Sequence, residues 1–185
     1  MQNISNNMYK LSIILIGITF IFGCSEKVSN TDAISHVIGF NQIKNKVFFL
    51  GPELDTMKVE ITAECDCCAS DLILKEDSIF LIGNYCLEEN EYTYGRYHVR
   101  DNKLILNFNS KSLMVSNSHT DSIPPIYKFE DGTQKEVILE LTKIKNSVAF
   151  KIDNEFGLER KKEDAKKVIG SYKKDSIDKK LGIEL

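Results

Sequence analysis

Four cysteines carry the most distinctive chemistry of this chain. Three lie in the segment Cys65-Asp66-Cys67-Cys68, and the fourth is Cys86. Thiols in an oxidising compartment form disulfides, and thiolates also bind soft metal ions such as Cu(I) and Zn(II). Cys65 and Cys68 have the Cys-x-x-Cys spacing of redox sites, but the βαβ pattern of a thioredoxin-like site is missing around them. We therefore expect disulfides, with copper or zinc binding by these four residues as the alternative.

The order of elements along the chain is expected to bring Cys86 back to this cluster. Cysteines 65–68 precede, and Cys86 follows, an expected hairpin made of the apolar runs 72–74 and 79–82. A disulfide between them would close a loop of roughly twenty residues and contribute about 3 kcal/mol in the chain-entropy model. Four cysteines allow three pairings, so the pairing stays open. A zinc site needs four tetrahedral ligands, and His98 is a candidate to replace one of the cysteines.

No other residues form a recognisable catalytic pattern. The histidines, His36, His98 and His119, lie on different expected elements. No serine or cysteine lies in a nucleophile motif, and no glycine-rich loop is suited to hold a phosphate. The acidic pairs Glu88-Glu89 and Asp153/Glu155 are expected on the surface. We therefore predict that the protein is not an enzyme and nominate no catalytic or cofactor-binding residue.

The N-terminus has the order of a secretory signal, with a cation at Lys10, an apolar run over 11–22 and then Gly23-Cys24-Ser25. The apolar run is shorter than the roughly 20 residues of a spanning helix. The segment resembles a bacterial lipoprotein signal peptide with the lipobox Ile21-Phe22-Gly23-Cys24. The resemblance implies export, cleavage before Cys24, and acylation of Cys24 with diacylglycerol and a further fatty acid such as palmitate. The weaker alternative is an apolar N-terminal core helix.

The same resemblance gives an expected location in the cell envelope. Ser25 follows the cysteine, and by the enterobacterial sorting rule the absence of aspartate there favours the outer membrane. Inner and outer membrane both remain open, because that rule does not hold in every bacterium. Two or more acyl chains anchor a protein stably where one does not. We therefore expect the protein to bind the membrane through its lipid anchor.

Length and charge indicate one mature domain after residues 1–23 are removed. We expect a lipidated tether at 24–31, a β domain at 32–156 and a helical segment at 157–185. The first 133 residues after the signal carry 14 Lys and Arg against 21 Asp and Glu, whereas the last 29 carry 9 against 6. An exported, mostly acidic chain does not suit nucleic acid. The basic end reads as a solvated helix surface, or alternatively as a contact for anionic lipid or cell-wall polymer.

Short strands separated by turns dominate the middle of the chain. Alternation over Met57–Glu64 predicts a half-buried strand. Hairpins are expected over 72–82, 95–108 and 137–152, with an alternating strand over 92–99 and further strands at 46–50, 113–115 and 126–129. A glycine inside a strand often marks a bulge or a bend, which we expect at Gly95. Turns at roughly ten-residue intervals favour a small antiparallel barrel or sandwich of about eight strands.

The C-terminal segment changes to a helical period. Its apolar residues fall on one face of a helix: Ala165, Val168, Ile169 and Tyr172. A second short helix is expected from Asp175 to about Gly182. We expect both helices to pack against the β domain. A helix lying in the membrane surface is the weaker alternative, because the apolar face is narrow and lacks Phe and Trp.

Residues 65 to about 108 resemble the lipocalin-like N-terminal barrel of the copper-resistance and envelope-stress outer-membrane lipoproteins. The matching features are Cys65/Cys68, Leu72-Ile73-Leu74-Lys75-Glu76-Asp77, Phe80, Tyr94-Gly95-Arg96-Tyr97 and Lys103-Leu104-Ile105-Leu106. The resemblance covers about a quarter of the chain and implies a lipocalin-like barrel. It would also imply a role in copper handling. The extra Cys67 and Cys86 and the C-terminal half depart from that pattern.

These observations predict a lipid-anchored envelope protein with a non-catalytic role. The first hypothesis is a module that binds a small ligand at the mouth of the barrel or serves a structural role with an envelope protein partner. The alternative is a cysteine-based copper- or zinc-binding lipoprotein in metal homeostasis or envelope stress sensing.

Overall fold

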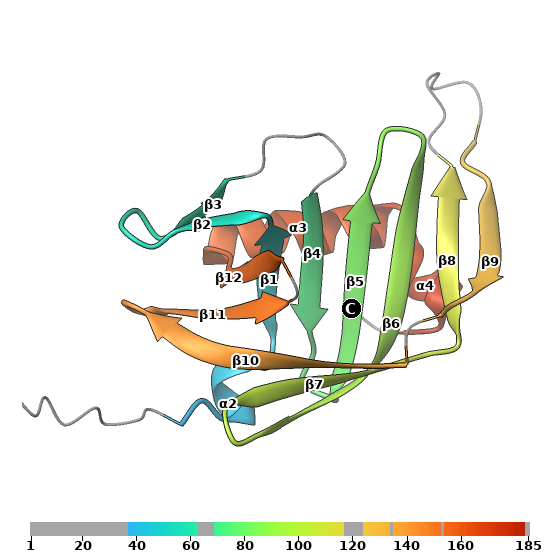
Figure 1. The fold of residues 1–185 in the computed structure, drawn as a ribbon. Helices are drawn as coiled ribbons and strands as arrows, with labels where there is room; N and C mark the ends of the chain where they lie inside the picture. The colour runs from blue at the N-terminus through green and yellow to red at the C-terminus, as the bar shows by residue number, and fades with distance from the viewer. Residues whose placement is uncertain (1–36, 63–68, 117–123, 134, 153, 184–185) are drawn as a thin grey trace, which may run out of the picture. The chain divides into compact units, whose positions relative to one another are not determined.

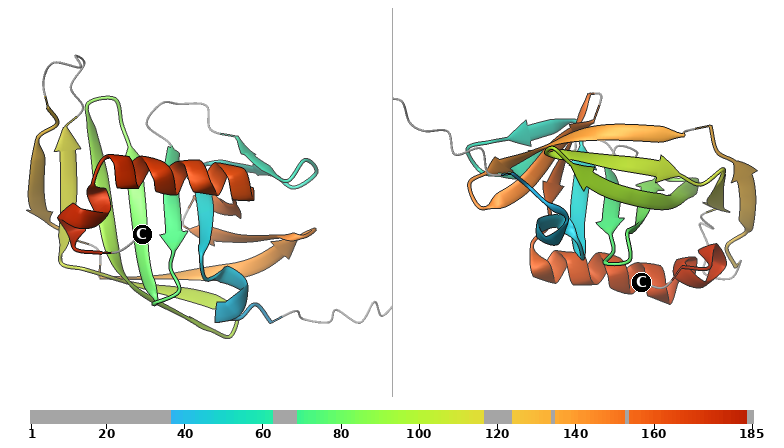
Figure 2. Two further views of the ribbon diagram at one scale, coloured as in Figure 1. Left: turned by 180° about the vertical axis from the view of Figure 1, so that it is seen from behind. Right: turned by 90° about the horizontal axis from the view of Figure 1, so that it is seen from below.

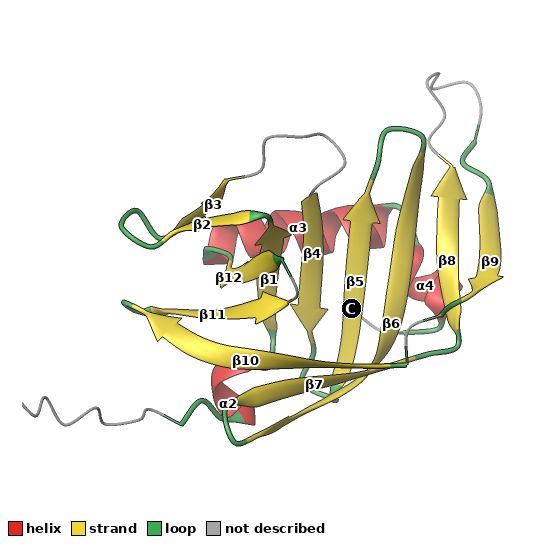
Figure 3. Ribbon diagram, viewed as in Figure 1, coloured by secondary structure: helices red, strands yellow, loops and turns green. Residues whose placement is uncertain are grey.

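The computed structural model describes residues 37–62, 69–116, 124–133, 135–152 and 154–183. Within them the chain is mainly β (Figures 1 and 3). The strands are β1 Lys46–Gly51, β2 Glu53–Asp55, β3 Glu60–Thr62, β4 Ala69–Leu74, β5 Ile79–Tyr85, β6 Glu89–Arg100, β7 Lys103–Phe108, β8 Lys111–Ser116, β9 Tyr127–Asp131, β10 Glu136–Ile144, β11 Ser147–Ile152 and β12 Glu155–Glu159. The helices are α2 Phe40–Ile43, α3 Lys162–Lys174 and α4 Ile177–Leu181.

Eight of these strands close an antiparallel barrel. Their order around it is β1-β4-β5-β6-β7-β10-β11-β12, and β12 pairs again with β1. The pairing of β5 with β6 completes the ring. The prediction of a small antiparallel barrel or sandwich of about eight strands with C-terminal helices is therefore confirmed, and the barrel is the form that the chain adopts.

The long strand β6 holds two partners along one edge. Its last residues pair with β7 as part of the barrel wall, and its first residues pair with β8. Strand β9 pairs with β8 in turn, so the β8–β9 hairpin extends the sheet beyond the barrel wall (Figure 1). Gly95 lies where the two partners of β6 meet. A Cβ there would come within 2.0 Å of the Asn107 carbonyl oxygen, so this glycine permits a close approach of β7. The register of β6 with β5 and with β7 runs without an inserted residue at Gly95, so the structure has no bulge there.

The barrel interior is a packed apolar core. It is formed by Ile38, Ile43, Phe48, Leu50, Leu72, Leu74, Phe80, Ile82, Tyr97, Leu104, Leu106, Leu139, Leu141, Val148 and Phe150. The residues before β1 close one end of it. Phe40 of α2 stacks on Tyr97 with ring centroids 5.6 Å apart, and the Ile38 backbone N–H donates to Asn102 Oδ1 at 2.6 Å. An eight-stranded barrel is just wide enough for side chains to fill, which is the case at this end.

A second apolar cluster lies outside the barrel, under the C-terminal helices. It is formed by Val47, Ile73, Leu81, Tyr92, Leu113, Val115, Tyr172, Ile177 and Leu181. Helix α3 crosses the outer face of the barrel wall (Figure 2), so β1, β4 and β5 are buried on both faces. Strands buried on both faces have continuous rather than alternating apolar residues, which explains the runs Val47-Phe48, Leu72-Ile73-Leu74 and Phe80-Leu81-Ile82. The predicted packing of the helical segment on the β domain is confirmed.

The strand predicted over Met57–Glu64 is wrong for its first half. Met57 is 83% exposed, and Val59 has a left-handed backbone with φ of 60°. The cause lies just upstream, where the Asp55 carboxylate accepts hydrogen bonds from the backbone N–H of Met57 and of Lys58. Such a local side-chain-to-backbone bond favours a turn. The chain therefore makes the small β2–β3 hairpin, and of the described residues 57–62 only 60–62 are extended.

Strand β12 was not predicted. It pairs with β1 and β11, so it belongs to the barrel. It extends to Glu159, past residue 157, where the helical segment was expected to begin. The expected tether at 24–31 lies outside the described residues.

Candidate functional site

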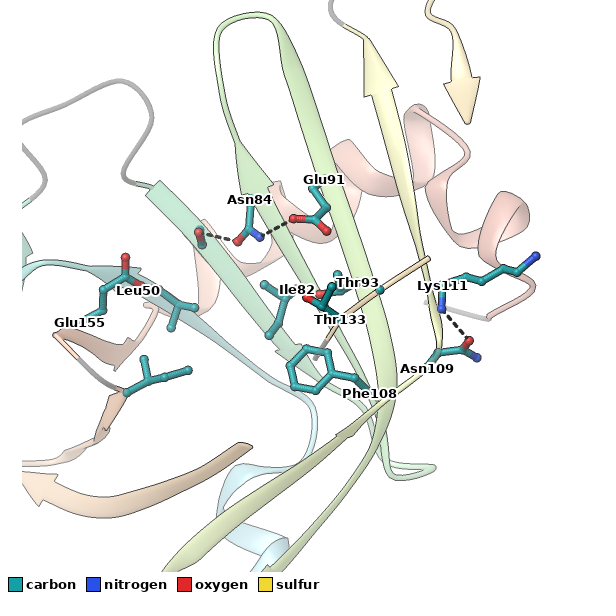
Figure 4. A pocket seen from close by; sticks show the side chains of 13 residues that line it. Leu50, Ile82, Asn84, Glu91, Thr93, Phe108, Asn109, Lys111, Thr133 and Glu155 are labelled. Atoms are coloured by element: carbon teal, nitrogen blue, oxygen red, sulfur yellow. Dashed lines mark hydrogen bonds between the residues drawn. The ribbon is translucent and has the colours of Figure 1, made fainter. Parts of the chain in front are cut away.

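A pocket of about 240 Å³ opens at the end of the barrel opposite to α2 (Figure 4). Its walls come from strands far apart in the sequence. The lining residues are Leu50, Ser70, Ile82, Asn84, Glu91, Thr93, Phe108, Asn109, Lys111, Gly132, Thr133, Ile152 and Glu155. Leu50 and Ile82 also belong to the packed interior. The pocket is therefore a shallow mouth above an apolar core, with polar groups at its rim.

Three polar residues form one row across neighbouring strands of the mouth. Ser70 on β4 is the register partner of Asn84 on β5, and Asn84 is the register partner of Glu91 on β6. The Ser70 hydroxyl donates to Asn84 Oδ1 at 2.8 Å. Asn84 Nδ2 then donates to Glu91 Oε2 at 3.4 Å. This chain of bonds orients the Asn84 amide and holds the Glu91 carboxylate at the rim.

The charge at the mouth is negative. Glu91 and Glu155 bring two carboxylates to the lining. Lys111 brings the one lysine of the lining, but its ammonium points away from the other labelled side chains (Figure 4). The backbone N–H of Lys111 donates to Asn109 Oδ1 at 3.2 Å. Carboxylates and amide oxygens accept hydrogen bonds, so this arrangement suits a ligand that donates them, above all a cation.

The sequence-predicted site residues fall in a different place. Cys24, Cys65, Cys67 and Cys68 lie outside the described residues. Cys86 is exposed just after β5, and its backbone N–H donates to Asn90 Oδ1 at 3.2 Å. Ala69, which follows the cluster in sequence, is the register partner of Tyr85, which precedes Cys86. Disulfide formation or metal binding by the four cysteines stays a prediction.

Of the three histidines, His98 lies in the described part of the chain. His98 is exposed on β6 and pairs with Ile105 of β7. His36 and His119 lie outside the described residues. Among residues 37–62, 69–116, 124–133, 135–152 and 154–183, no three His, Cys, Asp or Glu side chains form a group suited to hold a metal ion.

Neither a family model nor a curated protein nor a solved structure matches this chain. The mouth must therefore be interpreted from its own chemistry. In the part of the chain that the structure describes, no helix has both the length and the apolar character needed to cross a membrane.

The pattern of the sequence did not reveal the mouth. The hairpin expected over 72–82 stops two residues before Asn84, and the strand expected from Tyr92 starts one residue after Glu91. Both residues flank a polar loop and carry no motif. The signal that could have revealed these residues was the register between β5 and β6. Pairing Ile82 with Thr93 places Asn84 opposite Glu91.

A second polar cluster lies under α3 on the outer wall of the barrel. The Asp71 side chain is 3% exposed, and its carboxylate accepts from Arg160 Nε at 2.5 Å and from the Tyr85 hydroxyl at 3.1 Å. The hydroxyls of Tyr85 and Tyr172 share a further hydrogen bond. Gly83 allows this approach, since a Cβ there would lie 2.1 Å from the Tyr172 hydroxyl oxygen. The cluster is closed by the helix, so its role is to attach α3 to the barrel.

Raising the pH above 10 is expected to release α3 from the barrel. Burial raises the pKa of Tyr92 to about 12 from the ordinary value of 10.0, and burial also raises the pKa of Tyr85 and of Tyr172. Folding therefore favours the neutral phenols. Their contribution is fully present below pH 10 and is lost as the pH rises through the folded values. For Tyr92 alone the loss amounts to about 2–3 kcal/mol.

Tyrosinate absorbance and helical circular dichroism, followed together in an alkaline titration, measure this effect. The buried tyrosines are expected to ionise late and together with the loss of helix signal. The variant Tyr92→Phe lacks one of these groups, so its alkaline transition is expected at higher pH. Ionisation of all tyrosines near pH 10 with the helix signal intact would contradict the prediction.

Proposed function

We propose that this chain is a lipid-anchored protein of the cell envelope that binds a small cationic molecule at the mouth of its barrel, without catalysis. The observation that carries the binding role is the row Ser70–Asn84–Glu91, which presents a carboxylate in a concave mouth. The lipoprotein-like N-terminus ending at Cys24 supports the anchor.

The dimensions of the mouth support a small ligand. Its volume of about 240 Å³ is below the roughly 300–1,000 Å³ of common ligand sites. Beneath it the barrel is filled by apolar side chains, so a long acyl chain has no space to enter. The aliphatic and aromatic lining of Leu50, Ile82 and Phe108 suits a short carbon chain.

The polar lining supports a ligand with positive charge. Glu91 and Glu155 are both only partly exposed, and charge-assisted hydrogen bonds in such positions are shorter and stronger than neutral ones. A small amine with a short carbon chain combines the two properties. Its ammonium would bind the Glu91 carboxylate while its methylene groups cover the apolar lining.

Replacing Glu91 with glutamine is expected to weaken amine binding about tenfold or more, because a charged acceptor becomes a neutral one. Putrescine and ethanolamine serve as probes, with glycerol and succinate as the neutral and anionic comparisons. Binding is followed by the amide resonances of Asn84, Glu91 and Thr93 in ¹⁵N-labelled protein. The amines are expected to shift these resonances, and succinate is expected to leave them unchanged.

Glu89→Gln is the matched control. Glu89 lies on the same strand two residues away and loses the same charge, but it is exposed and does not line the pocket. Its affinity for putrescine is expected to stay near that of the native protein. Equal losses in both variants would indicate general electrostatic attraction, and mouth resonances that no probe shifts would leave the structural role as the better hypothesis.

A further inference from the structure

Strand β9 forms one end of the sheet. In the described residues it pairs with β8 along one edge and with no strand along the other. Figure 1 and the view from below in Figure 2 both place it at the side of the molecule, beyond the barrel wall. An unpaired strand edge exposes a row of backbone N–H and C=O groups that can pair with another strand.

The hydrogen bonds at both ends of β9 show which groups face outward. The Ser116 N–H donates to the Ile126 carbonyl, and the Gly132 N–H donates to the Ser110 carbonyl. Antiparallel partners alternate between bonded and non-bonded pairs. With the uniform register of β8 and β9, the backbone groups of Lys128 and Glu130 therefore point toward β8. Those of Tyr127, Phe129 and Asp131 point outward.

The side chains of β9 complement a second copy of the same strand. Lys128 and Glu130 carry opposite charges on either side of Phe129, and they pair with each other within the strand at 2.5 Å. In an antiparallel pair centred on Phe129, each Lys128 lies opposite the Glu130 of the other copy. Phe129 lies opposite its own counterpart, and its side chain is 48% exposed in the single chain. Strand edges that avoid pairing often carry lysines, whereas this edge places Lys128 and Glu130, of opposite charge, on either side of Phe129, with Asp131 as a further acidic residue at its end.

We propose that two copies of this chain associate through their β9 strands in an antiparallel, symmetric pair centred on Phe129. Each outward-facing residue exchanges both backbone hydrogen bonds with its opposite residue, and the two Lys128–Glu130 pairs form between chains. Such an isologous contact uses the same patch on both copies and closes at the dimer. A single five-residue strand buries less surface than stable complexes do, so the association is reversible.

Charge reversal on β9 tests this pairing. In Lys128→Glu or in Glu130→Lys alone, both cross-strand pairs carry like charges, and dimerisation is expected to weaken about tenfold or more. The double variant Lys128→Glu/Glu130→Lys restores opposite charges and is expected to dimerise as the native chain does. The dimer population is measured by native mass spectrometry and sedimentation of the purified full chain in one non-ionic detergent, over a range of concentrations.

Mixing the two single variants isolates the contact from any association through other parts of the chain. With one variant labelled with ¹⁵N, heterodimers are expected to exceed homodimers. Phe129→Pro is a second test, because its outward N–H is not needed for pairing with β8 and proline is tolerated at such an edge position. It is expected to remain folded and monomeric. A native chain that is monomeric at all concentrations, or single reversals that dimerise as well as it does, would overturn the proposal.

Discussion

Replacing Arg160 with methionine is expected to lower the free energy of unfolding by about 3–5 kcal/mol, the range for breaking a buried ion pair by removing one partner. Arg160 neutralises Asp71, whose side chain is 3% exposed under α3. Its guanidinium also lies over the Phe49 ring, 4.3 Å from the centroid. Without it the Asp71 carboxylate stays buried with the Tyr85 hydroxyl as its remaining hydrogen-bond donor in the cluster. Urea unfolding followed by circular dichroism measures the loss.

Lys46→Met is the matched control for this substitution. Lys46 forms an ion pair with Glu159 on the neighbouring strand at 2.6 Å, but both side chains are partly exposed, at 30% and 22%. Pairs in such positions contribute at most about 1 kcal/mol. If the two variants lose the same free energy of unfolding, the burial of Asp71 does not determine the loss. That result would contradict the role of the cluster under α3 in attaching this helix to the barrel.

Phe150→Ala is expected to cost about 3–5 kcal/mol through loss of buried area and the cavity that remains. Phe150 is 1% exposed in the barrel interior, with its ring centroid 5.2 Å from that of Phe48. The ring also lies over Gly157 of β12, where a Cβ would approach it to 2.1 Å. Strand β12 joins β11 to β1, so the substitution is expected to weaken the packing that closes the barrel. The unfolding midpoint in urea is expected to fall without a change in cooperativity.

Phe129→Ala removes a ring of the same size from an exposed position. At concentrations low enough to keep the chain monomeric, its unfolding free energy is expected to change by about 0.5 kcal/mol or less. Comparable losses at Phe150 and Phe129 would contradict the assignment of Phe150 to a packed core. The chain contains no tryptophan, so circular dichroism and tyrosine fluorescence are the suitable probes for both variants.

Local patterns predicted most hairpins correctly. The hairpin of β4 and β5 follows from two apolar runs separated by a polar turn, and its partners are near in sequence. The helical face of Ala165, Val168, Ile169 and Tyr172 also packs as expected. The strand expected at 57–64 failed for an equally local reason, because the Asp55 carboxylate binds backbone N–H groups and favours a turn that the alternation of side chains does not reveal.

The candidate site could not be predicted in the same way. Ser70, Asn84 and Glu91 have ordinary neighbours in sequence, and they become a row only when three strands take their register. Glu155 reaches the same mouth on β12, whose pairing with β1 joins residues about a hundred positions apart. A pattern of period two states which face a residue occupies, but it does not state which distant strand lies beside it.

The sequence by itself determined the class of fold, the near-sequence hairpins and the amphipathic C-terminal helix, because periodicity and turn chemistry act over a few residues. Only the tertiary structure decided that β12 closes a barrel with β1, that polar residues gather at one mouth, and that β9, among the described strands, is paired along one edge alone, with opposite charges around Phe129. These features depend on non-local pairing, in which burial of the shared core selects one register among many that the local pattern allows.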